Sequence, residues 1–490
     1  MPQDLPGFYY DAEKNRYFPV KSPIPGSSSR NSSSASTSAQ KPPPKPSNKT
    51  KYAAKVVTML HVRELCGNSI SCNKKKVNFQ EQYQKIQTSK PIIWKYQGTQ
   101  RIADAALEHI CLDVQTPNGL TETEILLTGG LNGTFCCYEV GSIGEHAING
   151  LQCMPNLVHP MNIEKETASL KSPGLIWRPI GALVQMPSNV SCINLPRNYH
   201  SIDSSTSHAL ITTLGSESSG GSVYSMNISD PLEYDLGVAM LSRRIDEISR
   251  FKSTIWTSDS NGNQAVIGTN IGVALVNIDS GRKSWICRSK SDVLSLQFDS
   301  SGNNVLCGFR NGSIVNIDIR QKFQEFHDTN TILPRHQIPL PSRGKKREKQ
   351  WFELRGNIHQ SRTISMPSSV SCLARLKTYD DYFLASSMDG TIRLYDHRFK
   401  GALVQFYEGH VNSHTRIQIG VDPSERFFIS GGEDLCLRVW SIKSGEMLYE
   451  DKFMKSVATS VCWPLTRCGN RFGGGAWLGS QEGMFYVNTT

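Results

Sequence analysis

The chain has 490 residues, of which 38% are hydrophobic and 20% charged, so it is compatible with a folded protein but too long for one compact core. The net charge of +10 comes from two segments, residues 41–76 with nine Lys or Arg against Glu64, and RGKKREK at 343–349. Because the rest is close to neutral, the charge argues against a phosphate-binding surface spread over the fold, and we do not expect a nucleic acid as partner.

Targeting signals and cysteine spacing indicate the compartment. No apolar run reaches the roughly 18–20 residues that span a bilayer, so we expect no membrane partner. The start, MPQDLPGFYYDAEKNRYF, lacks a charged region followed by an apolar core, which argues against secretion. Thirteen cysteines without a C-x-x-C pair or repeated spacing predict free thiols in a reducing compartment. We therefore expect a nuclear or cytoplasmic protein.

The first 50 residues divide into two parts. Residues 5–18 place aromatic clusters on both sides of a turn-capable stretch, which predicts a small hairpin with aromatic cross-strand pairs in an N-terminal motif at 1–20. Residues 21–50 are rich in Ser, Pro and Lys, and we interpret them as a disordered linker, because nothing there offsets the entropy lost on ordering.

Residues 51–90 are predicted to be a helical segment. Residues 51–66 are helix formers without Pro or Gly, and Val56, Val57 and Leu60 share one side of such a helix. A second, more polar helix is predicted at 74–88. Two interpretations remain open at this point: the helices pack on the main domain, or they bind a partner protein.

Beyond residue 90 the chain repeats one outline, in which small or apolar residues are followed by a turn and then by a strand. The turn anchors of the seven segments are Gly133, Gly221, Gly272, Gly312, Gly390, Leu435 and Gly483, and an apolar residue stands two positions after each. Four of the six intervals between anchors are 40 to 51 residues, near the period of four-stranded propeller blades. The two longer intervals predict insertions near 141–180 and 321–362.

This repeat predicts an all-β fold, a seven-bladed β-propeller over residues 91–490. The final segment ends after what would be the third strand of its blade. An open fourth position would leave an exposed sheet edge, so we expect the strand-like PIIWKYQ at 91–97 to fill it.

The segments resemble WD repeats. An acid stands immediately before two of the turn anchors (Asp389, Asp434), and a strand ends in Trp440. His410 belongs to a Gly-His pair, and the resemblance implies that it hydrogen-bonds a strand serine and the turn aspartate. No Trp-Asp dipeptide occurs anywhere in the sequence.

No catalytic motif is evident. The sequence contains no H-E-x-x-H, no G-x-S-x-G and no G-x-x-x-x-G-K-[ST], so we predict neither an enzyme nor a bound cofactor or metal ion. The run RGKKREK is interpreted either as a solvated loop without a function or as a functional segment, which would be a nuclear-import signal or a loose contact with nucleic acid or an acidic tail.

Two segments end in Asp-x-Arg: Asp318 and Arg320 in the fourth, and Asp396 and Arg398, after Tyr395, in the fifth. In a propeller these strand ends emerge on one face of neighbouring blades. Two guanidinium groups there would form a site for carboxylates or carbonyl groups of a partner. The alternative is that each arginine pairs with the aspartate of its own blade.

The Asp-x-Arg endings resemble the docking box of the WD-repeat substrate receptors of cullin-4 ubiquitin ligases, with Tyr395 in place of Trp and Ile317 in the same position of the weaker match. The stretch LPGFYYDAEKNRYF is similar to the N-terminal signature of a member of that family.

The resemblance implies a non-catalytic receptor that docks on the adaptor, damage-specific DNA-binding protein one, through Arg398, Arg320 and the helix at 51–66, and presents an unknown protein substrate. The alternative function is a WD-repeat scaffold in a nuclear protein or ribonucleoprotein complex.

Overall fold

The computed structural model describes residues 8–11, 16–19, 69–72, 75–116, 119–141, 150–160, 173–195, 208–216, 219–233, 241–320, 330–334, 351–355, 363–398, 402–464 and 475–489. The chain divides into two units, Met1–Lys55 and Val56–Thr490. The predicted linker at 21–50, the helix at 51–66 with Val56, Val57 and Leu60, and the basic run at 343–349 lie outside the described residues.

In the first unit, the strands β1 (Phe8–Asp11) and β2 (Arg16–Pro19) form an antiparallel pair. The register sets Tyr9 opposite Phe18 and Tyr10 opposite Tyr17. The aromatic residues therefore occupy cross-strand positions of a two-stranded hairpin, as expected from the aromatic clusters on both sides of the turn-capable stretch.

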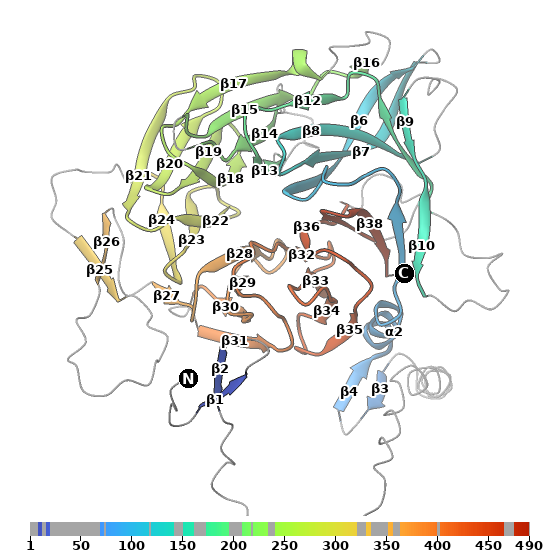
Figure 1. The fold of residues 1–490 in the computed structure, drawn as a ribbon, viewed down its shortest axis with the longest axis vertical. Coiled ribbons are helices and arrows are strands. Elements are labelled where there is room, and N and C mark those ends of the chain that lie inside the picture. The colour runs from blue at the N-terminus through green and yellow to red at the C-terminus, as the bar shows by residue number, and fades with distance from the viewer. Residues whose placement is uncertain are drawn as a thin grey trace, which may run out of the picture. The chain divides into compact units, whose positions relative to one another are not determined.

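The second unit is an all-β propeller (Figure 1). Four of its sheets have four antiparallel strands each. They are β13 (Val190–Asn194), β14 (His208–Thr213), β15 (Ser222–Asn227) and β17 (Ile245–Arg250); β22 (Val293–Phe298), β23 (Asn304–Phe309), β24 (Ser313–Asp318) and β27 (Ile364–Ser365); β28 (Val370–Arg375), β29 (Tyr382–Ser387), β30 (Ile392–Asp396) and β31 (Ala402–Tyr407); and β32 (Ile419–Val421), β33 (Phe427–Gly431), β34 (Leu437–Ser441) and β35 (Met447–Asp451).

Three further sheets carry additional strands. One contains β6 (Ala106–Thr116), β7 (Gly119–Gly129), β8 (Thr134–Gly141), β9 (Gly150–Cys153), β11 (Leu175–Pro179), β12 (Leu183–Gln185) and β16 (Leu232–Glu233); the next contains β18 (Ile255–Asn261), β19 (Gln264–Thr269), β20 (Gly272–Asn277), β21 (Lys283–Ser289), β25 (Asn330–Pro334) and β26 (Trp351–Arg355); the last contains β36 (Ala458–Cys462), β37 (Ala476–Ser480), β38 (Gly483–Asn488), β5 (Ile92–Tyr96) and β10 (Pro155–His159). Both predicted insertion regions thus supply outer strands.

The sheets form a closed ring. Their first strands contact one another in the order β6, β13, β18, β22, β28, β32 and β36, and β36 contacts β6 again. The closing strand is confirmed, because β5 pairs antiparallel with β38 and so fills the position that the end of the chain leaves open. Figure 1 shows the N-terminal β5 beside the C-terminal β38.

The hydrophobic core is divided among the interfaces between neighbouring sheets. Between the sheets of β28 and β32, for example, the ring of Phe428 stacks on Trp440 with centroids 4.9 Å apart, and Tyr407 meets Phe428 edge to face at 4.8 Å. Each sheet buries both faces in this way, which explains why the strands read as nearly continuous apolar runs.

Six of the seven turn anchors have a positive φ, which favours glycine, and Gly221 is the exception. Gly390 has φ of 83°, and Leu435 adopts φ of 67° at the same position of its own sheet. The sequence outline therefore predicted this turn correctly even where leucine replaces glycine. The backbone of Leu435 is strained, because a residue with a side chain disfavours a positive φ.

The second predicted helix is shorter than expected. The helix α2 spans Phe79–Thr88, and Lys75–Asn78 forms the strand β4, which pairs with β3 (Ser69–Cys72). The helix begins after Asn78 because the side chain of this residue accepts a hydrogen bond from the Gln80 amide at 2.9 Å. No helix in the described parts of the chain is both long and apolar enough to cross a membrane.

The structure also shows which of the described cysteines form a disulfide and which are free thiols. Cys111 is disulfide-bonded, so the prediction of free thiols is wrong at this position. The other described cysteine side chains are free thiols, most of them buried: Cys136, Cys137, Cys153, Cys192, Cys287, Cys307, Cys372, Cys436 and Cys462.

A 3-10 helix, η3, spans Ser242–Arg244 and leads into β17.

Candidate docking face

Both Asp-x-Arg endings form the same local unit at the ends of β24 and β30. The Arg320 guanidinium donates from Nε and Nη2 to the two carboxylate oxygens of Asp318 at 3.0 and 2.7 Å, and the Arg320 amide donates to the same aspartate at 3.0 Å. Arg398 binds Asp396 in the same way, at 3.1, 2.7 and 2.9 Å. The spacing of two residues allows one carboxylate to hold both the backbone and the guanidinium of its arginine.

The arginines remain accessible despite these pairs. The Arg320 side chain is 65% exposed and that of Arg398 is 47% exposed. The guanidinium groups lower the pKa of Asp318 and of Asp396 through their hydrogen bonds, so both pairs are ionised at neutral pH. The structure thus shows the alternative in which each arginine pairs with the aspartate of its own sheet. This pairing directs the guanidinium group toward solvent and does not bury it.

Arg398 has two further partners that the sequence did not identify. Nη1 lies 3.0 Å from the carboxylate of Asp381, and Nη2 donates to the hydroxyl of Tyr382 at 3.3 Å, with the guanidinium 5.6 Å from the centre of that ring. Asp381 ends the turn between β28 and β29, and Tyr382 is the first residue of β29. Nothing local to Arg398 in the sequence points to them, because sheet pairing alone brings this turn to the end of β30.

The two arginines lie on the same face of neighbouring sheets. The Ile319 amide donates to Asn303 at 2.9 Å, and the His397 amide donates to Asp381 at 3.0 Å, so each ending lies against the turn between the first two strands of its own sheet. These two turns are joined, because the hydroxyl of Ser300 donates to the carboxylate of Asp380. Figure 1 shows the sheets of β24 and β30 side by side.

Tyr395 does not belong to this surface. Its side chain is only 3% exposed, its ring stacks on Phe383 at 5.5 Å, and its hydroxyl lies 3.1 Å from the sulfur of Met366. The expectation that it contacts a partner is therefore wrong. Tyr395 fills the interface between two sheets, as an apolar-facing strand position requires, and Asp396, only 5% exposed, acts through Arg398.

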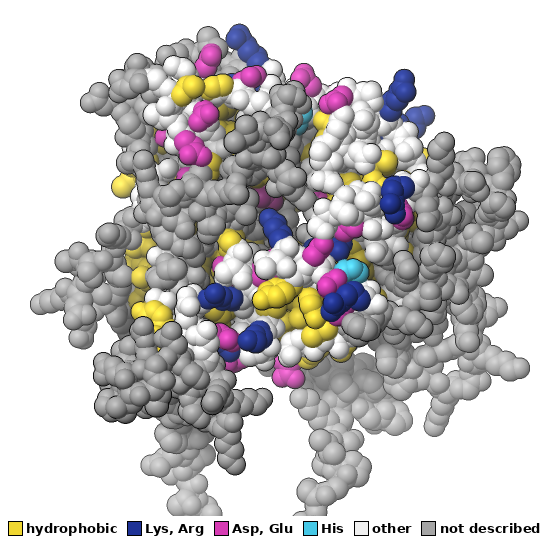
Figure 2. All heavy atoms as spheres, turned by 180° about the vertical axis from the view of Figure 1, so that it is seen from behind, with side chains coloured by type: hydrophobic (Ala, Val, Ile, Leu, Met, Phe, Trp, Pro, Cys, Tyr) yellow, Lys and Arg dark blue, Asp and Glu magenta, His cyan; other side chains and the backbone are white. Residues whose placement is uncertain are grey.

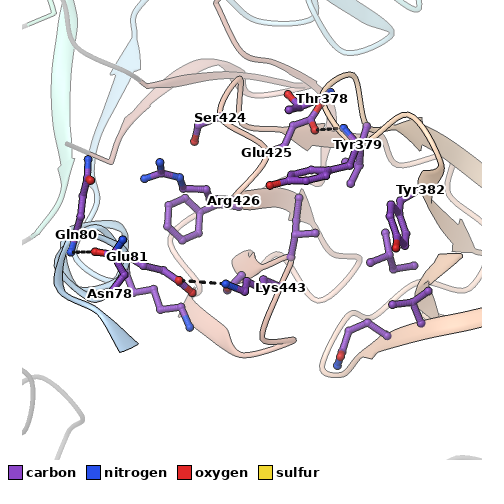
Figure 3. Close-up of a pocket in the computed structure, with 18 residues that line it drawn as sticks. Asn78, Gln80, Glu81, Thr378, Tyr379, Tyr382, Ser424, Glu425, Arg426 and Lys443 are labelled. Atoms are coloured by element: carbon purple, nitrogen blue, oxygen red, sulfur yellow. Dashed lines mark hydrogen bonds and ion pairs between the residues drawn. The ribbon is translucent and has the colours of Figure 1, made fainter. Parts of the chain in front are cut away.

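A groove lies beside Arg398, between α2 and the sheets of β30 and β34. It has a volume of about 560 Å³ and is lined on one side by α2, including Glu81 and Lys85, and on the other by Tyr379, Tyr382 and Val404. In Figure 3 the helix residues lie across the groove from Tyr382, with Lys443 reaching Glu81. Tyr382 links the groove to Arg398, because it lines the groove and its hydroxyl accepts a hydrogen bond from Arg398.

The helix α2 is fixed to this face by polar contacts. The Lys85 ammonium, which is buried, donates to the Ser444 hydroxyl at 2.9 Å and lies 3.6 Å from Glu446. Lys443 lies 3.4 Å from Glu81, and Arg426 donates to Gln84. For this second helix, packing on the propeller is the interpretation that the structure supports.

The WD-type positions have structural roles. His410 Nε2 lies 3.0 Å from the Gly431 carbonyl oxygen and 3.4 Å from the Ser430 hydroxyl, which is the expected contact with a strand serine. Burial lowers the pKa of His410, so it is neutral at pH 7. Trp440 Nε1 donates to the Glu408 carbonyl at 2.9 Å.

The two turn aspartates have local partners. Asp389 accepts bonds from the Thr391 amide and hydroxyl at 3.1 and 2.7 Å. Asp434 pairs with Arg438 instead of His410, so the expected contact between the histidine and the turn acid is replaced.

The described residues contain one group with the donor atoms of a metal site, Asp434, Cys436 and Glu450. Arg438 forms ion pairs with both carboxylates, and its contact with Glu450 is 2.7 Å. Since a cation of the protein already neutralises these acids, the group fits a structural ion-pair network better than a metal centre.

Glu108, on the strand β6, has a raised pKa. Burial raises the pKa of Glu108 to about 7, opposed in part by Lys377, and the thiol of Cys462 lies 3.8 Å from its carboxylate. The carboxyl group is therefore partly protonated at neutral pH, and it is linked to the cysteine of a different sheet.

Comparison with known proteins agrees with this geometry. The family "WD domain, G-beta repeat" matches residues 359–396 and 401–441, so the first match ends at Asp396 and the second includes Trp440. The chain contains WD40 repeats. The first match spans β27 to β30 and the second spans β31 to β34, so each joins the outer strand of one sheet to the first three strands of the next.

The chain is similar over part of its length to DDB1- and CUL4-associated factor 4. The Homo sapiens protein is 27% identical over 197 residues, 40% of this chain and 33% of the relative, and the Bos taurus protein is 26% identical over the same shares. DDB1- and CUL4-associated factor 4-like protein 2 of Homo sapiens is 30% identical over 182 residues, 37% of each chain. The chain thus spans about a third of the length of the relatives it matches.

Proposed function

We propose that this protein is a non-catalytic substrate receptor of a CUL4 ubiquitin ligase, and that it docks on the adaptor DDB1 through the face that carries Arg320 and Arg398. The observation that carries the proposal is the pair of half-exposed guanidinium groups, each held in place by its own aspartate, on neighbouring sheets. The names of the similar proteins, which associate them with DDB1 and CUL4, give the adaptor. A pre-oriented arginine loses little entropy when it binds a carboxylate or a carbonyl group of a partner.

The propeller that we propose has seven blades. The support is that the described residues contain seven sheets with at least four strands, and that the first strands of these sheets contact one another in a closed cycle.

The proposed location is the nucleus or the cytoplasm, supported by the basic run at 343–349 and by the free thiols. We propose no catalytic step for this chain. Its part in ubiquitination is to hold a protein substrate near the ligase, and the substrate would use a surface other than the adaptor-docking arginines.

The experiment is capture of purified DDB1 by the full chain carrying Arg320→Ala and Arg398→Ala. If each arginine is an interface hot spot worth about 2 kcal/mol, each single change weakens binding by roughly 30-fold. The matched control is Arg310→Ala. Arg310 pairs with Asp292 at 2.9 Å and is 54% exposed, but it lies at the opposite end of the β23–β24 hairpin.

Two results decide the proposal. Loss of DDB1 capture in the double variant, with the melting temperature and the control unchanged, supports it. Wild-type capture by the double variant, or purification of the chain with a different nuclear complex and without DDB1, would replace it with the scaffold function.

A further inference from the structure

The outer strand β31 is an unusual sheet edge. It pairs with β30 and with no other strand among the described residues. Its sequence, ALVQFY, contains no charged residue and no proline. The corresponding outer strands of the other four-stranded sheets are protected: β17 and β35 carry charged residues, and β27 has only two residues. Proteins normally blunt a free edge by these means, because its unpaired backbone groups bind other strands.

The side chains of β31 add an apolar surface to this free backbone. Leu403, Val404 and Phe406 are 53%, 49% and 40% exposed. Val404 also lines the groove beside α2, so the edge and the groove are continuous. Figure 2 shows hydrophobic side chains gathered next to Lys and Arg side chains in the lower centre of the face seen from behind.

The same chain adds strands at this position in other sheets. β26 pairs with β21, β10 pairs with β5, and β9 pairs with β11, each antiparallel and each beyond the fourth strand of its sheet. The outer edge of a blade in this fold therefore accepts an additional strand without disturbing the ring. In the sheet of β31 that position is vacant among the described residues.

Arg393, on the strand β30 next to β31, indicates that a segment bound at this edge carries a negative charge. Arg393 lies opposite Phe406 in the register of β30 and β31, so the two side chains share one face of the sheet. Arg393 Nη1 lies 3.4 Å from the Tyr395 hydroxyl, while its buried Nε has no hydrogen-bond partner, and no described carboxylate pairs with it. An acidic residue of an added strand would neutralise this arginine.

We propose that β31 binds an extended segment of a partner protein as an added β-strand, and that the face of this segment next to Phe406 carries both apolar residues and an acidic residue. The backbone of the segment pairs with the free edge, its apolar side chains cover Leu403 and Phe406, and a carboxylate reaches Arg393. The inference deepens the proposed function and depends on it only for the identity of the partner as a protein to be ubiquitinated.

The test uses the full chain without DDB1 and fluorescent peptides of about seven residues: a Val–Glu peptide, Thr-Val-Thr-Glu-Thr-Val-Thr, which puts Val and Glu on one face, the same peptide with Lys in place of Glu, and the Val–Glu peptide interrupted by proline. By fluorescence anisotropy we expect the Val–Glu peptide to bind at least ~10-fold tighter than either of the others. Phe406→Lys and Leu403→Lys each weaken this binding by ~10-fold or more, because a lysine protects the edge. Arg393→Gln removes the preference for Glu over Lys.

The control is Leu131→Lys, a turn residue that is 44% exposed and distant in the fold from β31, which leaves peptide binding unchanged. Equal binding of the proline peptide would exclude backbone pairing and overturn the proposal, as would indifference to Phe406→Lys or no binding of any peptide. Sedimentation that reveals a dimer abolished by Phe406→Lys would also overturn it, because a second copy would then occupy the edge. Since DDB1 is absent, failure here leaves the docking of Arg320 and Arg398 on the adaptor to its own test.

Discussion

Glu425 links two neighbouring sheets close to Arg398, and its replacement tests whether this link stabilises the fold. Its buried carboxylate accepts bonds from three successive backbone amides of the neighbouring sheet, Lys377, Thr378 at 2.9 Å and Tyr379 at 3.2 Å. These amides begin the turn that continues to Asp381, the second carboxylate of Arg398. The residue therefore holds the turn on which the arginine depends.

The magnitude follows from the number of bonds. A hydrogen bond to a charged group contributes about 1.5–3 kcal/mol when buried, and partial access of water to the turn reduces this to about 1 kcal/mol for each amide. We therefore expect Glu425→Ala to lower the free energy of unfolding by about 3 kcal/mol. Glu425→Gln keeps one acceptor oxygen and the packing, and it should cost roughly half as much.

The assay is urea denaturation followed by tryptophan fluorescence, comparing midpoints at equal slope. The control is Glu446→Ala, which removes an exposed glutamate with one ion pair at 3.6 Å and should change stability by less than about 0.5 kcal/mol. If Glu425→Ala resembles this control, or if the Gln variant is less stable than the Ala variant, the amides do not depend on this carboxylate and the reasoning fails.

Two further predictions concern a strained turn and a buried acid. Leu435→Gly removes a leucine from φ of 67°, and relief of about 1–2 kcal/mol, reduced by the greater freedom of glycine in the unfolded chain, should raise stability by about 0.5–1 kcal/mol in the same urea assay; a lower midpoint would contradict it. Glu108 has a pKa raised from 4.5 to about 7 by burial, so the stability present below about pH 4.5 is lost as the pH rises through about 7. Glu108→Gln lacks this titration, and its stability relative to the wild type should rise by on the order of 2–3 kcal/mol between about pH 5 and pH 8; a difference that is independent of pH would rule out the buried carboxyl as the cause.

The sequence by itself determined the repeating unit and its turns. The hairpin of the second and third strands is encoded by local chemistry, since a small residue permits the turn and an apolar residue two positions later begins the next strand. Leu435 follows this outline and adopts φ of 67°, near the values of 81°, 87° and 83° at the anchors Gly133, Gly312 and Gly390. The closing strand could also be predicted, because a chain that ends with three strands in a blade requires a fourth from elsewhere.

The start of α2 and the role of Tyr395 could not be read from the sequence. A run of Lys and Val at 75–77 is compatible with a helix in isolation, but it pairs with β3 and leaves Asn78 as the helix cap. Tyr395 ends an apparently accessible motif, yet the neighbouring sheet buries it. In both cases a contact with a residue far away in the sequence overrides the local pattern.

Tertiary structure alone decided what surrounds Arg398. The sequence placed an aspartate two residues before it, which fixes the local fork, but Asp381, Tyr382 and the groove reach it only through strand pairing and the packing of α2. Local spacing constrains contacts within a turn because the backbone there has few conformations. Contacts between strands and sheets depend on which surfaces are buried together, and this is settled only when the whole ring has closed.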